Sequence, residues 1–161
     1  MDIITPVTRH LDQLALPYRV YRHSGPIESL DQVARERGQR PTQVVRSIVF
    51  RLSEGEYLMV LVAGPAQVSW PSLRAFLNQS RISMADPEDV QAVTGYVTGA
   101  VSPLGLPRPM RILVDRSLLA EEELSVGSGV RGVAVILTRD DLLKSVGTFE
   151  IGDFTRSVSA T

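Results

Sequence analysis

The sequence lacks cysteine and has few histidines, and both absences exclude kinds of chemistry. Of 161 residues none is Cys and 2 are His, so the chain offers no thiol nucleophile, no disulfide and no thiolate metal site. The two histidines, His10 and His23, cannot build a metal centre by themselves. We therefore expect a protein that uses neither a metal ion nor another cofactor.

Long apolar runs and an excess of basic residues are also missing. The net charge is -1, whereas proteins that wrap duplex DNA or lie on anionic membranes normally carry a large basic excess. No segment approaches the roughly 20 apolar residues of a membrane helix. The N-terminal stretch has charges inside its apolar part, unlike a signal peptide. We expect a cytoplasmic protein that binds neither membranes nor duplex DNA, although a local basic patch stays compatible with this composition.

The remaining composition is that of a folded domain with a hydrophobic core. Hydrophobic residues make up 43% and charged residues 22% of the chain. A chain of this length buries roughly two thirds of the surface that it exposes when unfolded, so it needs no disulfide or metal to fold. We expect one domain that spans residues 1–161.

Hydrophobic periodicity and capping residues predict short helices between short strands. Helices are expected at 7–16, 29–38, 69–77, 86–94 and 138–146. Strands are expected at 18–21, 47–52, 57–62, 111–115, 124–127 and 132–137, the second and third of them as an antiparallel hairpin. The pattern indicates a mixed sheet flanked by helices rather than regular βαβ winding. Trp70 lies among apolar residues and is expected in the core.

A loop rich in glycine and proline, residues 95–109, is the most informative part of the chain. It holds Gly95, Gly99 and Gly105, and glycine lets a backbone approach a ligand closely and point consecutive N–H groups at a carbonyl or an anion. From the residues alone this is either a binding or oxyanion loop or a mere connection. Ser102 lacks the G-x-S-x-G context of a hydrolase nucleophile.

Residues 94–105, with the sequence T-G-Y-V-T-G-A-V-S-P-L-G, resemble the ligand loop of the YbaK/prolyl-tRNA editing domain family. This family comprises bacterial aminoacyl-tRNA deacylases, either free-standing or attached to prolyl-tRNA synthetase. Residues 21–23, 44–50, 126–132 and 140–143 match further family segments in the same order. The resemblance extends from Val7 to about Phe154.

The resemblance implies an α+β fold, in which short helices surround a mostly antiparallel, barrel-like mixed sheet with an open cleft. It implies a free-standing enzyme that hydrolyses the ester of a mischarged tRNA, with cysteine or alanine on tRNA for proline as the expected substrate. The expected partners are the aminoacyl-tRNA acceptor end and prolyl-tRNA synthetase. A catalytically inactive module of the same fold, which binds tRNA ends or an aminoacyl-like small molecule, is the alternative. A purely structural partner of a synthetase is a third.

The same resemblance assigns roles to individual residues. Amides near Gly99 and Ala100 would stabilise the oxyanion, and Arg46 would supply a positive charge. Residues expected to bind the substrate are Tyr21, His23, Ser47, Thr98, Val101, Ser102, Pro103, Gly127, Ser128 and Gly129. Two positions depart from the family pattern, because Arg46 replaces a lysine and Ala134 falls at the place of an acid.

An arginine cluster and an aromatic residue have two interpretations each. Arg35, Arg37 and Arg40 fit either contacts with acceptor-stem phosphates or, more commonly, a solvated helix end. Tyr21 fits either stacking on the terminal adenine or simple partial burial at a strand end.

Overall fold

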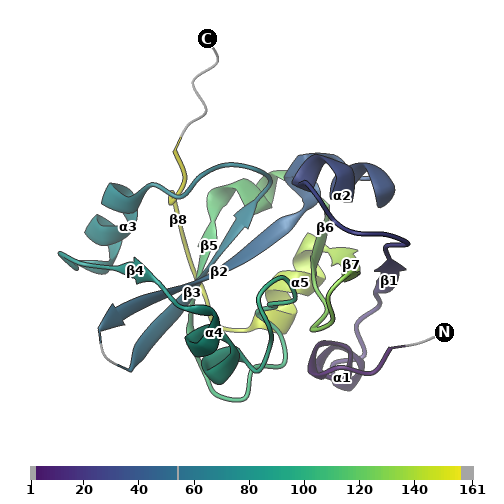
Figure 1. Ribbon diagram of the computed structural model, residues 1–161, viewed down its shortest axis with the longest axis horizontal. Helices are drawn as coiled ribbons and strands as arrows, with labels where there is room; N and C mark the ends of the chain where they lie inside the picture. The colour runs from purple at the N-terminus through teal and green to yellow at the C-terminus, as the bar shows by residue number, and fades with distance from the viewer. Residues whose placement is uncertain (1–2, 54, 157–161) are drawn as a thin grey trace, which may run out of the picture.

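Two β-sheets organise the fold, and short helices lie around them (Figure 1). The computed structural model describes residues 3–53 and 55–156. One sheet has the strand order β1-β7-β6 and the other the order β4-β2-β3-β5-β8. Four of the six strand pairings among these described residues are antiparallel. The expected α+β class with mostly antiparallel strands is therefore confirmed, but the sheets do not close into a barrel.

The bounds of the elements agree closely with the sequence pattern. The strands are β1 Arg19–Arg22, β2 Val45–Ser53, β3 Glu56–Ala63, β4 Ser83–Met84, β5 Arg111–Asp115, β6 Glu123–Gly127, β7 Val133–Thr138 and β8 Glu150–Gly152. The helices are α1 Pro6–Gln13, α2 Leu30–Glu36, α3 Trp70–Leu77, α4 Pro87–Thr94 and α5 Arg139–Val146, with 3-10 turns η1 Pro41–Gln43 and η2 Arg116–Ala120. None of the described helices has the length and apolar character needed to cross a bilayer.

Helix ends form where the capping residues predict them. The Ser29 hydroxyl accepts a hydrogen bond from the Gln32 amide at 3.1 Å, and α2 begins there. The Thr138 hydroxyl accepts one from the Asp141 amide at 3.1 Å at the start of α5. These local hydrogen bonds are independent of the rest of the fold, which is why the sequence reveals them.

Two strands, β4 and β8, have no counterpart in the predicted elements. β4 pairs antiparallel with β2, and β8 pairs parallel with β5. They contain two and three residues, which is too short for a recognisable alternation of apolar and polar side chains. Each exists because a neighbouring strand offers an unpaired edge, so only the tertiary fold defines it.

The β2–β3 hairpin is the centre of the molecule and separates two cores. Val45 and Val49 face a large core with Met59 and Leu61 of β3, whereas Phe50 faces a smaller one. This follows from the alternation of side chains along a strand. Trp70 packs edge-on against Phe50 with ring centroids 5.3 Å apart, but it is only partly buried and lies at the border of this core rather than inside it.

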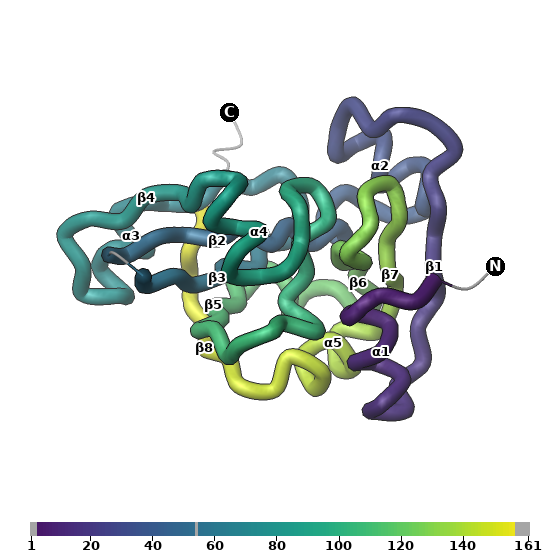
Figure 2. Tube along the Cα trace, turned by 60° about the horizontal axis from the view of Figure 1, so that its bottom comes forward, coloured from purple at the N-terminus to yellow at the C-terminus, as the bar shows by residue number. Residues whose placement is uncertain are grey.

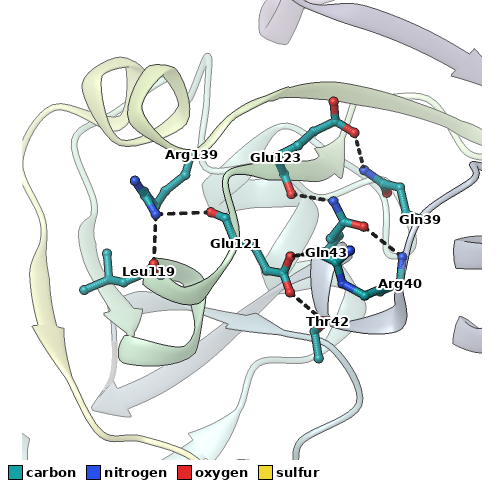
Figure 3. Close-up of polar contacts among 8 residues, drawn as sticks. All are labelled: Gln39, Arg40, Thr42, Gln43, Leu119, Glu121, Glu123 and Arg139. Carbon is teal, nitrogen blue, oxygen red and sulfur yellow. Dashed lines mark hydrogen bonds and ion pairs between the residues drawn. The ribbon is translucent and has the colours of Figure 1, made fainter.

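The two sheets are joined where β2 begins. Val44 forms a parallel bridge with Ser125 of β6. Next to it, Figure 3 shows the carboxylate of Glu121 accepting hydrogen bonds from Arg40 and from the Thr42 hydroxyl, the latter at 2.9 Å. The Gln43 side-chain amide donates to the Glu123 carbonyl at 3.1 Å. This polar junction links η1 to the segment that leads into β6, and so fixes the start of β2.

The polar junction predicts a pH-dependent loss of stability. The hydrogen bond from Arg40 is the main reason why the pKa of Glu121 lies below its ordinary value. A carboxylate whose pKa is lower in the folded state stabilises the protein above its unfolded pKa of about 4.3, and this contribution disappears as the pH falls through the folded value. Glu121→Gln should therefore cost about 1–2 kcal/mol at neutral pH and almost nothing at strongly acidic pH.

Urea unfolding at both pH values measures this difference. The matched control is Glu122→Gln, because Glu122 is the exposed neighbour and its side chain has no hydrogen bond or ion pair within the described ranges. An equal loss of stability for Glu121→Gln at neutral and acidic pH would contradict the role given to its charge.

Candidate functional site

A cleft of about 720 Å³ lies where the two sheets meet. Its walls come from β2, from the ends of β6 and the start of β7, from α2 and the residues before it, and from the loop after α4. The lining residues include Glu28, Arg37, Val45, Arg46, Ser47, Val49, Thr98, Gly99, Val101, Val126, Gly127 and Val133. The lining is largely aliphatic, with two arginines, the carboxylate of Glu28 and a few hydroxyl groups.

The strand β2 offers an unpaired edge to this cleft. The Gly64 amide donates to the Val44 carbonyl on the β3 side, and the Ala85 amide donates to the Val49 carbonyl on the other side. Backbone groups along an antiparallel strand alternate between the two sides, so those of Val45 and Ser47 point away from β3, like those of Val49. The bridge between Val44 and Ser125 of β6 engages the start of this edge, and β4 engages its far end, so the stretch without a pairing strand among the described residues lies around Ser47.

Ser47 adds a hydroxyl group at the same place. Its Oγ is buried and has no hydrogen-bond partner among the residues that the structure describes. Ser47 also lines the cleft. A buried hydroxyl without a partner is costly, and a bound ligand would remove that cost by accepting or donating a hydrogen bond. The expectation that Ser47 belongs to the site fits this geometry.

The glycine-rich loop forms the wall opposite to this edge and is held by the β6–β7 hairpin. Figure 2 shows the loop beside that hairpin, and two hydrogen bonds connect them. The Gly129 amide donates to the Ala100 carbonyl at 3.1 Å, and Arg131 Nε donates to the Thr98 carbonyl at 2.9 Å. Thr98, Gly99 and Val101 line the cleft as a result.

Backbone amides of this loop differ in their availability. The Ala100 amide donates to the Val97 carbonyl at 3.0 Å and is therefore occupied within a turn, and Ala100 is buried. The amides of Gly99 and Val101 donate to no group within 3–53 and 55–156. Gly99 adopts a φ of +92°, which favours glycine. Of the two residues expected to supply oxyanion amides, Gly99 has an unoccupied amide and Ala100 does not, whereas the amide of the next residue, Val101, is unoccupied.

Gly127 lets the loop approach the end of β6. A Cβ at this position would lie 2.2 Å from the Val101 carbonyl oxygen and 3.0 Å from that of Ala100. Only glycine permits two backbones to come so close. Gly127 therefore lines the cleft itself and also allows the loop to pack against β6.

Four other expected substrate-binding residues support the cleft from behind and do not line it. The hydroxyl of Ser102 accepts a hydrogen bond from the Leu104 amide, and Pro103 is buried beside it. The hydroxyl of Ser128 donates to the Val133 carbonyl at 2.7 Å and is fully buried. A Cβ on Gly129 would lie 2.9 Å from the Tyr96 ring. The sequence motif marks these residues because they shape the loop and the hairpin.

Arg46 reaches the cleft in a different way from the expected one. It lines the cleft, but its Nε donates to the Gly64 carbonyl at 2.8 Å and its Nη2 to the Ala66 carbonyl. The head group therefore does not simply project to the cleft mouth, because carbonyls of the turn after β3 hold it. Burial lowers the pKa of this guanidinium. Ala134 is buried in β7, outside the cleft lining, and brings no polar group to it.

Tyr21 and His23 also lie behind the wall of the cleft. The His23 side chain is 0% exposed, and its Nδ1 lies 2.8 Å from Glu36 Oε1. Tyr21 packs edge-on against the His23 ring at a centroid distance of 4.9 Å. Instead of these two, Arg37 lines the cleft, with its Nε 3.0 Å from His23 Nε2.

The arginines near the end of α2 do not act as one cluster. Arg35 is exposed, Arg40 binds Glu121 and Arg37 enters the wall of the cleft. The sequence shows three arginines within six positions, but only the tertiary fold separates them. The sequence marks Arg37 only as one member of this cluster, and nothing in its spacing shows that it alone of the three lines the cleft.

Catalysis by a histidine-activated serine finds no support in this arrangement. His10 Nε2 lies 2.7 Å from the Ser145 carbonyl oxygen, and His23 contacts Glu36 and Arg37. Neither ring makes a hydrogen bond to a serine hydroxyl within the described part of the chain. No group of three potential metal ligands is found there either. What the cleft lining does offer is Gly99 and Val101, whose backbone amides have no partner among the described residues.

Comparison with known proteins assigns the chain to a family. A sequence profile described as "Aminoacyl-tRNA editing domain" matches residues 24–145. A proline--tRNA ligase from Brachyspira hyodysenteriae is 28% identical over 105 residues, which cover 65% of this chain and 18% of that protein. A proline--tRNA ligase from Citrifermentans bemidjiense is 32% identical over 91 residues, which cover 56% of this chain and 16% of that protein.

Solved structures show the same fold. A protein proposed to be a trans-editing enzyme for prolyl tRNA synthetase superimposes with a TM-score of 0.83 at 22% identity, covering 96% of this chain and 100% of that one. The hypothetical protein APE2540 gives a TM-score of 0.83 at 20% identity, covering 94% and 100%. The chain spans less than a fifth of the length of the curated relatives described above.

Proposed function

Since the chain belongs to the aminoacyl-tRNA editing domain family, we propose that it hydrolyses the ester bond of a mischarged aminoacyl-tRNA. The observation that carries the proposal is a largely aliphatic cleft that is lined both by β2 and by Gly99 and Val101, whose amides have no partner among the described residues. An aminoacyl ester is already activated, so a protein nucleophile is unnecessary. This agrees with a chain that has no cysteine.

The reaction would proceed by attack of a water molecule on the ester carbonyl carbon, and the proton that this water loses would pass to the ribose oxygen that leaves. Negative charge then develops on the carbonyl oxygen, and the amides of Gly99 and Val101 stabilise it more strongly than they bind the neutral carbonyl. Their positions are fixed by the hairpin contacts at Thr98 and Ala100, so no reorganisation is needed during the reaction. The C–O bond to the tRNA ribose breaks, and the ribose hydroxyl and the free amino acid leave.

Two polar residues of β2 would complete the site. The Ser47 hydroxyl, buried and without a partner in the described structure, would form a hydrogen bond with the bound ester or ribose. Arg46 would bring positive charge for a substrate phosphate, because two carbonyls occupy only two of the five N–H donors of a guanidinium. Arginine differs from lysine in reach and in its planar fork, so Arg46 would bind in a geometry of its own.

The proposed substrate is a tRNA for proline that carries cysteine or alanine, and the proposed enzyme acts in trans. Two observations support this proposal. The curated relatives are named proline--tRNA ligases, and a solved structure with the same fold is described as that of a proposed trans-editing enzyme for prolyl tRNA synthetase. The valines that line the pocket, among them Val45, Val101 and Val133, suit a small apolar side chain. Prolyl-tRNA synthetase is a proposed partner on the same basis.

A catalytically inactive binding module is the second candidate. The observation that favours it is the change at two polar positions, where Arg46 is bound to carbonyls and Ala134 is buried and apolar. Such a module would bind the tRNA end and release no amino acid.

A deacylation assay distinguishes the two candidates. Purified protein is incubated with tRNAs that carry different amino acids, and release of each amino acid is followed over time. We expect turnover with cysteine or alanine on tRNA for proline and little turnover with proline on the same tRNA. Binding without release on every tRNA would instead support the inactive module.

A further inference from the structure

Arg37 is held in a fixed position in the wall of the cleft. Its Nε donates to His23 Nε2 at 3.0 Å and its Nη1 donates to the Ser125 hydroxyl at 2.9 Å. These partners come from the segment after β1 and from β6, so three distant parts of the chain meet at one guanidinium. A side chain that merely extended from a helix end into water would have no such contacts.

The hydrogen-bond partners of His23 determine which of its ring nitrogens carries the proton. A guanidinium only donates hydrogen bonds, so His23 Nε2 must accept one and the ring proton resides on Nδ1. That Nδ1–H donates to Glu36 Oε1 at 2.8 Å. Gln32 Nε2 donates to the other oxygen of Glu36 at 2.7 Å. This series of hydrogen bonds, from Gln32 through Glu36 and His23 to Arg37, orients the guanidinium. Both oxygens of the Glu36 carboxylate are used by Gln32 and His23.

The charge of Arg37 is not balanced by a carboxylate in direct contact. Among the described residues it takes part in no ion pair, and Glu28, which also lines the cleft, does not reach it. Burial lowers its pKa to about 10, so it remains positively charged at neutral pH. Two of its five N–H donors are used, and three have no partner in the described part of the chain. A partly desolvated charge with vacant donors favours binding of an anion.

We propose that Arg37 is an anion-binding residue of the cleft, and that it holds a phosphodiester group of the single-stranded tRNA end. The assignment rests on the proposed function, because an aminoacyl ester has no free carboxylate and its nearest anions are the phosphates of the terminal nucleotides. His23 and Ser125 are positioning residues that act through Arg37. The geometry suits a guanidinium, which can bind two phosphate oxygens at once.

The test compares Arg37→Gln with Arg35→Gln. Arg35 lies in the last turn of the same helix, is exposed, and makes no ion pair or side-chain hydrogen bond in the described structure. Binding of a fluorescently labelled single-stranded RNA with the sequence of a tRNA 3′ end is measured against salt concentration. Arg37→Gln should weaken this binding about tenfold to a hundredfold and reduce the salt slope by about 0.7. Arg35→Gln should change the affinity by less than about twofold.

A second variant and a second ligand keep the result interpretable. Arg37→Lys retains the charge without the fork and should recover part of the affinity, even if Arg37→Gln is less stable. In the deacylation assay Arg37→Gln should raise KM and change kcat little. Inorganic phosphate should compete with the RNA for the native protein only weakly, which separates a phosphodiester site from a site for free phosphate.

The outcomes separate this inference from the proposed function. An active enzyme whose RNA affinity and salt slope are unchanged by Arg37→Gln would overturn the inference and leave the deacylase proposal intact. A protein that releases no amino acid, yet loses RNA affinity on the Arg37→Gln change, would support the inference and reject the deacylase. Strong competition by inorganic phosphate with no effect of Arg37→Gln on RNA binding would also overturn the inference.

Discussion

Gly99→Ala is expected to lower the rate of deacylation by about 100-fold to 1,000-fold. Loss of one amide that stabilises an oxyanion costs about 3–4 kcal/mol in comparable sites. Gly99 adopts a φ of +92°, where a side chain is strained, so alanine would turn the peptide groups on both sides of this residue. The added Cβ would lie 3.7 Å from Arg131 Nε, which is ordinary van der Waals contact, so the expected effect comes from the strained backbone and not from a clash. Single-turnover kinetics with a mischarged tRNA measures the effect on the chemical step.

Gly95→Ala is the matched control for this change. Gly95 belongs to the same loop and has a φ of +79°, but it is not part of the cleft lining. Both variants should lose about 1–2 kcal/mol of stability from the strained backbone. Only Gly99→Ala should lose catalysis. If the two variants deacylate equally fast, the amide of Gly99 is not part of the oxyanion site.

Gly127→Ala is expected both to displace the loop of residues 95–109 and to destabilise the protein. The new Cβ would overlap the Val101 carbonyl oxygen at 2.2 Å, and both groups belong to the backbone or are fixed to it. Rotation of a side chain cannot relieve this contact, so the loop must move away from β6. Overpacking of this kind costs about 1–3 kcal/mol. We also expect at least a tenfold loss of activity, because the Val101 amide moves with its carbonyl.

Urea unfolding and deacylation of the same preparations test both parts of this prediction. The control is Gly25→Ala, since a Cβ at Gly25 meets no atom within 4 Å and the residue has no positive φ. That change should leave the stability equal or raise it by up to about 1 kcal/mol. A Gly127→Ala protein with native stability and native activity would show that the loop tolerates a wider separation from β6.

The local elements and the cleft loop could be predicted from the sequence because their signals are local. Ser29 and Thr138 cap helices through residues three positions away, and the hairpin of β2 and β3 follows from two β-prone runs around a turn. Gly99 and Gly127 stood out because glycine has a property that no other residue shares. The family resemblance, confirmed by the profile match, rests on such segments in the right order.

The tertiary structure alone decided which groups meet in the cleft and with what freedom. In the folded chain the Ala100 amide is hydrogen-bonded within a turn, whereas the Val101 amide has no partner among the described residues. Ser102 and Ser128 lie behind the wall of the cleft. Arg46 donates hydrogen bonds to backbone carbonyls, and Arg37, which the sequence shows only as a charge at a helix end, lines the cleft. A residue type fixes what a side chain can donate or accept. Which donors remain free depends on partners far away in the chain, such as Ser125 for Arg37, and only the folded chain brings those partners together.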